Sequence, residues 1–477
     1  MDYPSSFLSK AFLAGSWIET PRTFPVRSPA TGAVLAEVAD CGPGQARTAI
    51  EAAAQIFPEW RSTTPYLRSD LLRKWHDSIL AHAETLARTM AQEMGKPLVE
   101  ARREVLYAAA FVDWYAEEAK RIYGETVPSR DPRKRILVRS VPVGPVYGIT
   151  PWNFPAAMVT RKVAPALAAG CPFVLKPAEE SPLTALLLAK LWEESGGWPA
   201  VFQVLPGSDP AALSGPFLDD PRIRKLTFTG STPVGKRLYE RSAPTLKRIS
   251  LELGGGAPFL VFAEADLEKA AAGALVAKFR NGGQSCVAAN AFYLQKEIAG
   301  AFTRLFAEKV ASLRLGDPLD ETTQVGPLVN AQGLAKVQEL AADARSRGAK
   351  TILGGPCRDL FFSPTLLAEV PSDARILEEE IFGPLAPLCL FETEEEALAA
   401  ARRGRAGLAA YLWTQDLGRA LRFAEEIPYG IVGLNDGLPS THQAPFGGFR
   451  ESGIGREGGK WGLAEYLEPQ YLSFGWE

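Results

Sequence analysis

The chain contains 477 residues, of which 46% are hydrophobic and 22% charged, and its formal net charge is -3 at pH 7. Because a domain usually contains about 100 to 200 residues, we expect two or three domains with sizeable cores. The composition is that of an ordinary globular protein, and no stretch reaches the ~18 apolar residues needed to span a bilayer. The slightly acidic balance gives no electrostatic reason to expect nucleic acid or an anionic membrane as a partner.

Cysteine and histidine usage excludes several kinds of site. The five cysteines are scattered without a CxxC pair, which argues against a disulfide framework and a structural zinc site. The three histidines are too few and too widely spaced for HExxH or three-histidine chemistry, so we expect no metal. The first residues lack a basic region followed by an apolar run, and the sequence therefore predicts a cytoplasmic protein.

The first half of the chain changes from helical to alternating periodicity. Apolar residues at helical spacing between Gly44 and Lys120 predict three helices. Prolines and charges interrupt this pattern at 124–142, where alternating apolar residues predict an extended hairpin that projects from the body. Short apolar runs then predict strands, which we place at 146–150, 173–176, 201–205 and 223–230.

Helical stretches separate these strands. In one of them, Ser181 can cap the helix, Pro182 suits its first position, and Gly196 with Gly197 ends it. A second alternating region runs from 258 to 435. Such alternation is typical of parallel sheets built from βαβ units, so we predict an α/β protein with two lobes and a cleft.

The C-terminal tail, EYLEPQYLSFGWE, is extended and aromatic. An apolar strand at a chain end tends to pair with another strand. Its partner is expected to be either the 124–142 hairpin or another subunit.

Cys286 lies in the loop NGGQSCVAAN, between a predicted helix and a predicted strand. A buried structural thiol is the usual fate of a free cysteine and is our interpretation of the other four. A nucleophilic cysteine needs a base or a positive environment, and no histidine is near in sequence. A thiol hydrolase would require His442, in the distant GLPSTHQAPFGG loop, to reach Cys286.

Glu252 and Asn153 are the other candidate catalytic residues. Glu252 stands between two leucines in LELGGGAP, where burial would raise its pKa and suit it for general base work, unless it is a surface carboxylate. Asn153 follows a strand in YGITPWNFP, and its amide could stabilise an oxyanion, although asparagine is also common in turns.

Several motifs occur in a fixed order, namely PWNFP, KPAEESP, FTGSTPVG, LELGGGAP, GGQSC, EEEIFGP and PFGGFRESGIGREGG. Together they resemble the aldehyde dehydrogenase superfamily over nearly the whole chain, from about Phe12 to Trp476. The resemblance implies that Cys286 attacks an aldehyde, Asn153 holds the oxyanion, and Glu252 activates the water that hydrolyses the thioester.

The resemblance also implies a dinucleotide site. In FTGSTPVG, free backbone N–H groups at a strand-to-helix turn favour a pyrophosphate. A carboxylate at Glu179 accepts a 2'-hydroxyl and repels a 2'-phosphate, so NAD is expected, with NADP possible. The residues implied in cofactor binding are Thr150, Trp152, Lys176, Glu179, Gly230, Ser231, Gly235, Leu253, Glu380 and Phe382.

The same resemblance divides the chain and suggests assembly. It places an NAD-binding, Rossmann-type domain at 1–123 and 143–253, and a catalytic domain at 254–451. It places a small β oligomerisation arm at 124–142 and 465–477, which implies a homodimer or homotetramer. Ala288 stands where some members carry a second cysteine, so a disulfide switch at Cys286 is not expected.

Within the superfamily, the segments PWNFPAAMVTRKVAPALAAGCPFVLKPAEESP, KFRNGGQSCVAAN and GREGGKWGLAEYLE resemble the succinate-semialdehyde dehydrogenases. That likeness implies that Arg161, Arg280 and Ser440 bind the far carboxylate of the substrate, since arginine binds carboxylates bidentately. Structural ion pairs are the alternative roles for these arginines. Succinate semialdehyde is thus the expected substrate. Glutarate semialdehyde, a broad range of aliphatic aldehydes, thiol hydrolysis and an inactive binding protein are the alternatives.

Overall fold

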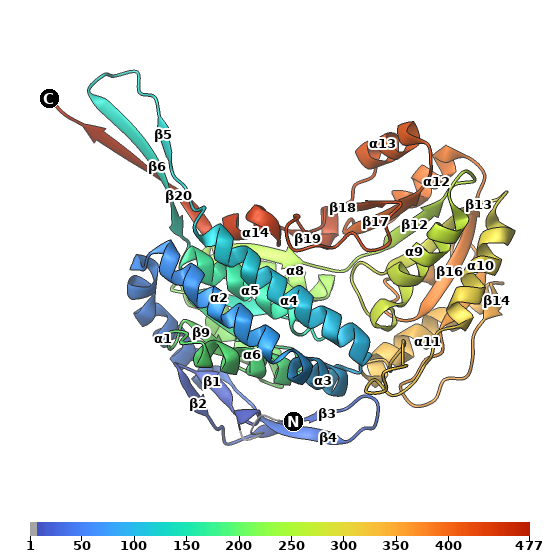
Figure 1. Ribbon diagram of the computed structural model, residues 1–477, viewed down its shortest axis with the longest axis horizontal. Coiled ribbons are helices and arrows are strands. Elements are labelled where there is room, and N and C mark those ends of the chain that lie inside the picture. Colours follow the sequence, from blue (N-terminus) through green and yellow to red (C-terminus); the bar gives the residue numbers. More distant parts are fainter. Residues whose placement is uncertain (1–6) are drawn as a thin grey trace.

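The computed structural model describes residues 7–477, and the first six residues of the predicted NAD-binding range lie outside it. The chain forms two large sheets, each covered by helices on both faces, and a narrow arm that projects from the body (Figure 1). The α/β prediction is confirmed.

The first large sheet has eight strands in the order β19-β11-β10-β7-β8-β9-β1-β2. Its five central strands are parallel, and β1, β2 and β19 pair antiparallel at the edges. The strands are β1 (Ala11–Leu13), β2 (Ser16–Ile18), β7 (Val146–Ile149), β8 (Phe173–Lys176), β9 (Phe202–Val204), β10 (Lys225–Thr229), β11 (Arg248–Glu252) and β19 (Gly453–Ile454).

Helices cover both faces of this sheet because alternate residues of each strand point to opposite sides. In β8, Phe173 and Leu175 join one core, whereas Val174 joins the other. The first core is covered by α2 (Pro65–Ala81), α3 (Ala83–Met94), α4 (Leu98–Ala119), α5 (Ala157–Ala169) and α6 (Pro182–Glu194). The second is covered by α1 (Pro43–Ser62), α7 (Pro210–Asp219) and α8 (Thr232–Ser242), which the short helix η2 (Ala243–Thr245) follows.

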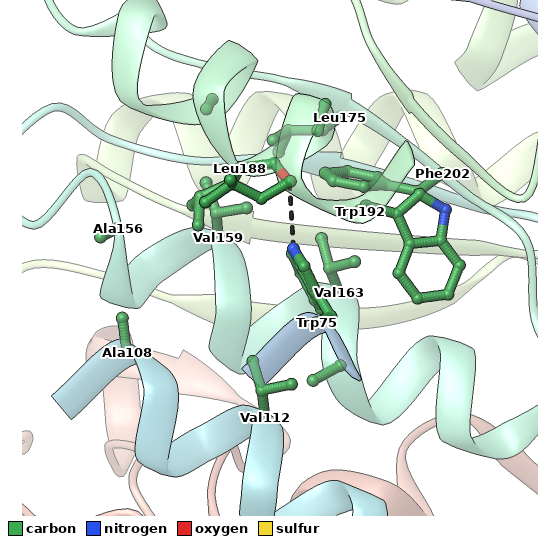
Figure 2. Packing of buried hydrophobic residues seen from close by; sticks show 14 of the residues in the cluster. Trp75, Ala108, Val112, Ala156, Val159, Val163, Leu175, Leu188, Trp192 and Phe202 are labelled. Atoms are coloured by element: carbon green, nitrogen blue, oxygen red, sulfur yellow. Dashed lines mark hydrogen bonds between the residues drawn. The ribbon is translucent and has the colours of Figure 1, made fainter. Parts of the chain in front are cut away.

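Two tryptophans pack among aliphatic side chains in the first core, as Figure 2 shows. Trp75 of α2 is fully buried, and its ring lies 5.6 Å from that of Trp192 on α6. The Trp75 indole N–H donates to the Leu188 carbonyl at 3.0 Å, so its one polar group is satisfied inside the core. The ring contact and the hydrogen bond together hold α2 against α6.

The second large sheet has seven strands in the order β14-β15-β16-β13-β12-β17-β18. All its pairs are parallel except β14 with β15. The strands are β12 (Ala257–Val261), β13 (Ala289–Gln295), β14 (Lys350–Leu353), β15 (Thr365–Ala368), β16 (Leu385–Phe391), β17 (Ala409–Trp413) and β18 (Ile431–Leu434). Its helices are α9 (Leu267–Phe279), η3 (Arg280–Gly283), α10 (Ala299–Ala311), α11 (Ala331–Ser346), η4 (Arg375–Leu377), α12 (Glu394–Ala401) and α13 (Leu417–Glu426).

The arm is a three-stranded antiparallel sheet of β5 (Glu125–Val127), β6 (Lys134–Pro142) and β20 (Leu467–Gly475). The C-terminal strand β20 pairs with β6 along its whole length, so of the two expected partners the tail pairs with the hairpin (Figure 1). The short helices η5 (Arg450–Ser452) and α14 (Gly459–Ala464) precede β20.

Three features differ from the sequence expectations. The range between Gly44 and Lys120 holds four helices, because α2 and α3 are divided at His82 by a change of backbone conformation without glycine or proline. The strands β1, β2, β3 (Thr23–Arg27) and β4 (Val34–Ala39) were not predicted. Ser181 does not cap α6, since its hydroxyl donates to the Trp152 carbonyl.

A carboxylate from another helix replaces that cap. Glu93 of α3 accepts the backbone N–H groups of Leu183 at 2.7 Å and of Thr184 at 3.0 Å. Among residues 7–477, no helix is long and apolar enough to cross a membrane.

Candidate active site

A cavity of about 850 Å³ lies between α4 and the end of α9. We call it the chamber. Its lining includes Tyr107 of α4, Phe154, Arg280 at the end of α9, and Ser440 in the loop that follows β18. A smaller cavity shares Arg280 and Ser440 with the chamber and is also lined by Ser285 and Val287. Since these two residues flank Cys286, the smaller cavity lies against the loop that carries the thiol.

Cys286 is partly exposed in the loop between η3 and β13. Burial, together with the nearby Glu380 and Glu252, raises the pKa of its thiol to about 12. Arg161 and Arg280 act in the opposite direction. The thiol is therefore protonated in the free protein and needs a proton acceptor before it can act as a nucleophile.

The glycines of LELGGGAP let this loop come close to the end of the first sheet. A side chain at Gly255 would place its Cβ 2.1 Å from the Cys286 carbonyl oxygen, so only glycine fits. The contact joins the loop of Cys286 to the segment that follows Glu252. Glu252, at the end of a strand of the first sheet, and Cys286, in the loop before a strand of the second sheet, are thereby brought to one site.

Glu252 ends β11 and is 3% exposed. Neither of its carboxylate oxygens has a hydrogen-bond partner within the described residues. Burial raises the pKa of Glu252 well above its ordinary value, and the negative charge of Glu457 adds to the effect. Glu252 is buried as the sequence predicts, and the surface-carboxylate interpretation is wrong.

Asn153 lies beyond the carboxyl end of β7 and is buried. Its side-chain amide donates to the Gln284 carbonyl at 3.1 Å, two residues before Cys286. Its own backbone carbonyl accepts from the side chains of Lys96 and Asn281, both at 2.9 Å. The amide is thus held beside the cysteine loop and has a second hydrogen to donate.

The carboxyl ends of the parallel strands carry most of the residues predicted to bind the cofactor. Gly230 and Ser231 follow β10, and Ser231 occupies the cap position of α8 without a side-chain capping bond. The first N–H groups of that helix are therefore available to an anion. A Cβ at Gly235 would lie 2.4 Å from the Leu253 side chain, so glycine lets α8 pack closely on the strand end.

Lys176 and Glu179 form an ion pair at the end of β8, with Nζ and Oε1 separated by 2.7 Å. The lysine is 2% exposed, whereas a third of the Glu179 side chain is exposed. Thr150 is buried, and its N–H donates to the Lys176 carbonyl at 3.2 Å. Lys176 ends β8, Glu179 lies in the turn that follows it, and Thr150 directly follows the adjacent strand β7.

Glu380 and Phe382 come from the second αβ region and reach the same place. Glu380 accepts the Gly255 N–H at 3.0 Å, and burial raises the pKa of its carboxyl to about 7. Phe382 has the left-handed φ of 54° and packs edge-on against Trp152, with ring centroids 5.5 Å apart. Residues from both regions therefore meet beside Cys286.

The candidate carboxylate-binding residues have different surroundings. The Arg280 guanidinium lines the chamber above the Phe154 ring, 5.2 Å from its centroid, and forms no ion pair with the described residues. Arg161 is 2% exposed, and its Nε lies 2.6 Å from a Glu457 carboxylate oxygen. Arg161 is not among the residues that line the chamber, whereas Ser440 is.

The geometry offers no support for a cysteine-histidine pair. The His442 ring packs on Trp114 and Phe111, with centroids 5.8 and 6.4 Å apart. The charged groups that act most on the Cys286 thiol are two glutamates and two arginines. Among residues 7–477, no group of three or more potential ligands is arranged to hold a metal.

Sequence reasoning missed Glu457 and Tyr107. Glu457 is 4% exposed and pairs with both Arg161 and Lys162. The signal for it was the adjacent basic pair on an apolar helix, which requires a buried acid from elsewhere. Tyr107 gave no such signal.

A Rossmann-type sheet, a second αβ region and a cysteine where they meet define an oxidoreductase fold. The model of the aldehyde dehydrogenase family matches residues 17–472. The chain therefore belongs to the aldehyde dehydrogenase family, and the resemblance predicted from the motifs is confirmed.

Curated relatives and a solved structure cover almost the whole chain. A succinate semialdehyde dehydrogenase of Acinetobacter baylyi is 48% identical, and a glutarate-semialdehyde dehydrogenase of Pseudomonas aeruginosa is 47% identical. Each match covers 98% of this chain and 98% of the relative. The crystal structure of an NADP-dependent enzyme of E. coli has a TM-score of 0.97 at 45% identity and covers 99% of each chain.

Proposed function

We propose that this protein oxidises a short aldehyde with a carboxylate at its far end, namely succinate or glutarate semialdehyde, to the dicarboxylic acid. The observation that carries the proposal is Arg280. A guanidinium without an ion-pair partner lines the chamber and the smaller cavity against the Cys286 loop, and such a group favours an anion. The names of the two relatives support the same substrate class.

The catalytic residues have separate tasks. The Cys286 thiol, whose pKa is raised to about 12, transfers its proton to water, and the sulfur attacks the aldehyde carbon. The Asn153 amide donates to the oxyanion that forms. A bound nicotinamide would supply a hydride acceptor, and the oxidised product would then remain on Cys286 as a thioester. Glu252 then takes a proton from the water that hydrolyses the thioester, a role suited to its raised pKa.

The cofactor residues fit a nicotinamide dinucleotide. The uncapped start of α8 suits the pyrophosphate, and the Lys176–Glu179 pair suits a ribose. We assign Glu380 and Phe382, which lie near Cys286 and Trp152, to the nicotinamide half. Glu179 favours NAD because its carboxylate repels a 2'-phosphate, although the E. coli structure is of an NADP-dependent enzyme.

The test measures reduced cofactor at 340 nm with both semialdehydes and with uncharged aldehydes of equal length, using NAD and NADP in turn. We expect the wild type to prefer the semialdehydes. Arg280→Ala removes that preference while neutral aldehydes are still oxidised, since only the carboxylate contact is lost. Arg304→Ala, an exposed arginine on α10, is the matched control. Equal use of charged and neutral aldehydes by the wild type would refute the proposal.

A further inference from the structure

Tyr107 has a hydroxyl that the mechanism above does not use. It belongs to α4, its side chain lines the chamber, and its hydroxyl oxygen is buried. This oxygen has no hydrogen-bond partner within the described part of the chain. A buried hydroxyl without a partner is costly, so a group that enters the chamber is the expected partner.

The other polar groups of the chamber show which kind of partner is missing. The Ser440 hydroxyl is also buried without a partner among residues 7–477, and Arg280 forms no ion pair there. The acids are already engaged. Glu104 pairs with Lys96, Glu100 accepts the Asn281 N–H at 2.7 Å, and Glu321 pairs with Arg102 at 2.6 Å. The Arg280 guanidinium can only donate, and the two hydroxyls can donate as well as accept, so an anion can satisfy all three groups.

Packing against a neighbouring ring fixes the position of the Tyr107 side chain. Its ring packs edge-on against Phe111, one helical turn away, with centroids 4.9 Å apart. The Phe111 ring also lies 5.4 Å from the Arg161 guanidinium carbon. Burial raises the pKa of Tyr107, and Arg161 and Arg280 both lower it, so the hydroxyl lies within electrostatic reach of both arginines. Tyr107 and Arg280 also line the same chamber.

We propose that the Tyr107 hydroxyl donates a hydrogen bond to the far carboxylate of the substrate, beside Arg280 and Ser440. This inference rests on the proposed function, because it concerns the same carboxylate. A phenol adds a donor without adding another buried charge, so it strengthens binding of the anion at no cost in charge repulsion. It makes Tyr107 a residue that determines substrate specificity.

Tyr107→Phe removes one oxygen and keeps the ring that packs on Phe111. We expect kcat/KM for the preferred semialdehyde to fall roughly 10- to 100-fold, mainly through KM, since a bond to a charged group is lost. The value for the neutral aldehyde of equal length should stay within about twofold, which also shows that the variant is folded. Tyr115→Phe is the matched control, because Tyr115 is a buried tyrosine of the same helix that does not line the chamber.

A binding measurement tests the same contact without chemistry. Succinate and glutarate carry a carboxylate at each end, and we expect the better inhibitor of the two to bind Tyr107→Phe roughly 10-fold more weakly than wild type. An unchanged semialdehyde preference with unchanged inhibition would overturn the role of Tyr107. So would an equal loss on charged and neutral aldehydes. If wild type itself shows no preference for semialdehydes, the proposed function has failed instead.

Discussion

Glu252 is a buried carboxylate whose surroundings set when it can act as a base. Burial and the charge of Glu457 both raise its pKa, whereas Arg161 and Lys162 lower it. Glu457 in turn pairs with these two cations. The two glutamates therefore share one pair of cations, and a change at Glu457 is transmitted to Glu252.

This arrangement predicts the pH dependence of thioester hydrolysis. The rate should rise with pH, because only ionised Glu252 accepts a proton from water. Glu457→Gln removes a negative charge that raises the Glu252 pKa, and it also releases two cations that lower it. Both effects lower the pKa, so the acid limb of the pH-rate profile should move to lower pH. The profile is measured as the rate of carboxylic acid formation in single turnovers from pH 5 to 9.

The control for this experiment is Glu468→Gln, an exposed partner of Arg248 at 3.1 Å. Its profile should match that of the wild type. A limb that stays in place or moves to higher pH in Glu457→Gln would show that Glu252 is not the group that titrates.

At the scale of elements, α6 depends on a residue that is remote in sequence. The N–H groups of Leu183 and Thr184 bond to Glu93, which is 1% exposed on α3. A buried helix start without acceptors is costly, because its first N–H groups have no partners within the helix. The carboxylate thus joins two helices that cover the same face of the first sheet.

Glu93→Ala should destabilise the protein by about 2 to 4 kcal/mol, since it leaves two buried N–H groups unpaired. Glu93→Gln keeps one acceptor oxygen and should lose about half as much. Thermal unfolding followed by circular dichroism measures both. Ser181→Ala is the informative comparison, because Ser181 occupies the cap position without capping, and its loss should be small. A larger loss at Ser181 than at Glu93 would contradict this account.

The same helix shows how far sequence patterns reach. Periodicity correctly predicted α6 and the strands on either side of it, because each is defined by local spacing of apolar residues. It did not predict that Glu93 replaces Ser181 as the cap, or that His82 divides α2 from α3. Those outcomes depend on tertiary contacts that no local window contains.

The candidate site divides in the same way. Cys286, Glu252 and Asn153 stand out because each lies in a distinctive loop or strand end, rich in glycine or proline. Tyr107 and Glu457 do not, since a tyrosine on an amphipathic helix and an acid in a glycine-rich loop have ordinary explanations. Tyr107 stands out in the structure because its hydroxyl has no partner among the described residues, and Glu457 because it pairs with two buried cations.

At the scale of the whole molecule, the arm is the part of the fold that belongs to neither of the two large sheets. It extends away from the body (Figure 1), and its strands expose several large apolar side chains. Tyr471 is 61% exposed, Phe474 50% and Leu137 36%. A slender sheet with apolar residues in solvent is an expected site of association, so we propose that it joins subunits into a dimer or tetramer.

Charged substitutions on the arm test that proposal. Tyr471→Lys combined with Phe474→Lys should reduce the oligomer to a smaller species, because burying two ammonium groups in an apolar interface is costly. Sedimentation velocity gives the molecular mass of each form, and 51.6 kDa corresponds to the monomer. Leu246→Lys, an 84% exposed residue outside the arm, is the control. A wild type that sediments as a monomer, or a double variant with unchanged mass, would show that the arm has another role. Because neither substituted residue lines the chamber, the reduced species also shows whether one subunit suffices for turnover.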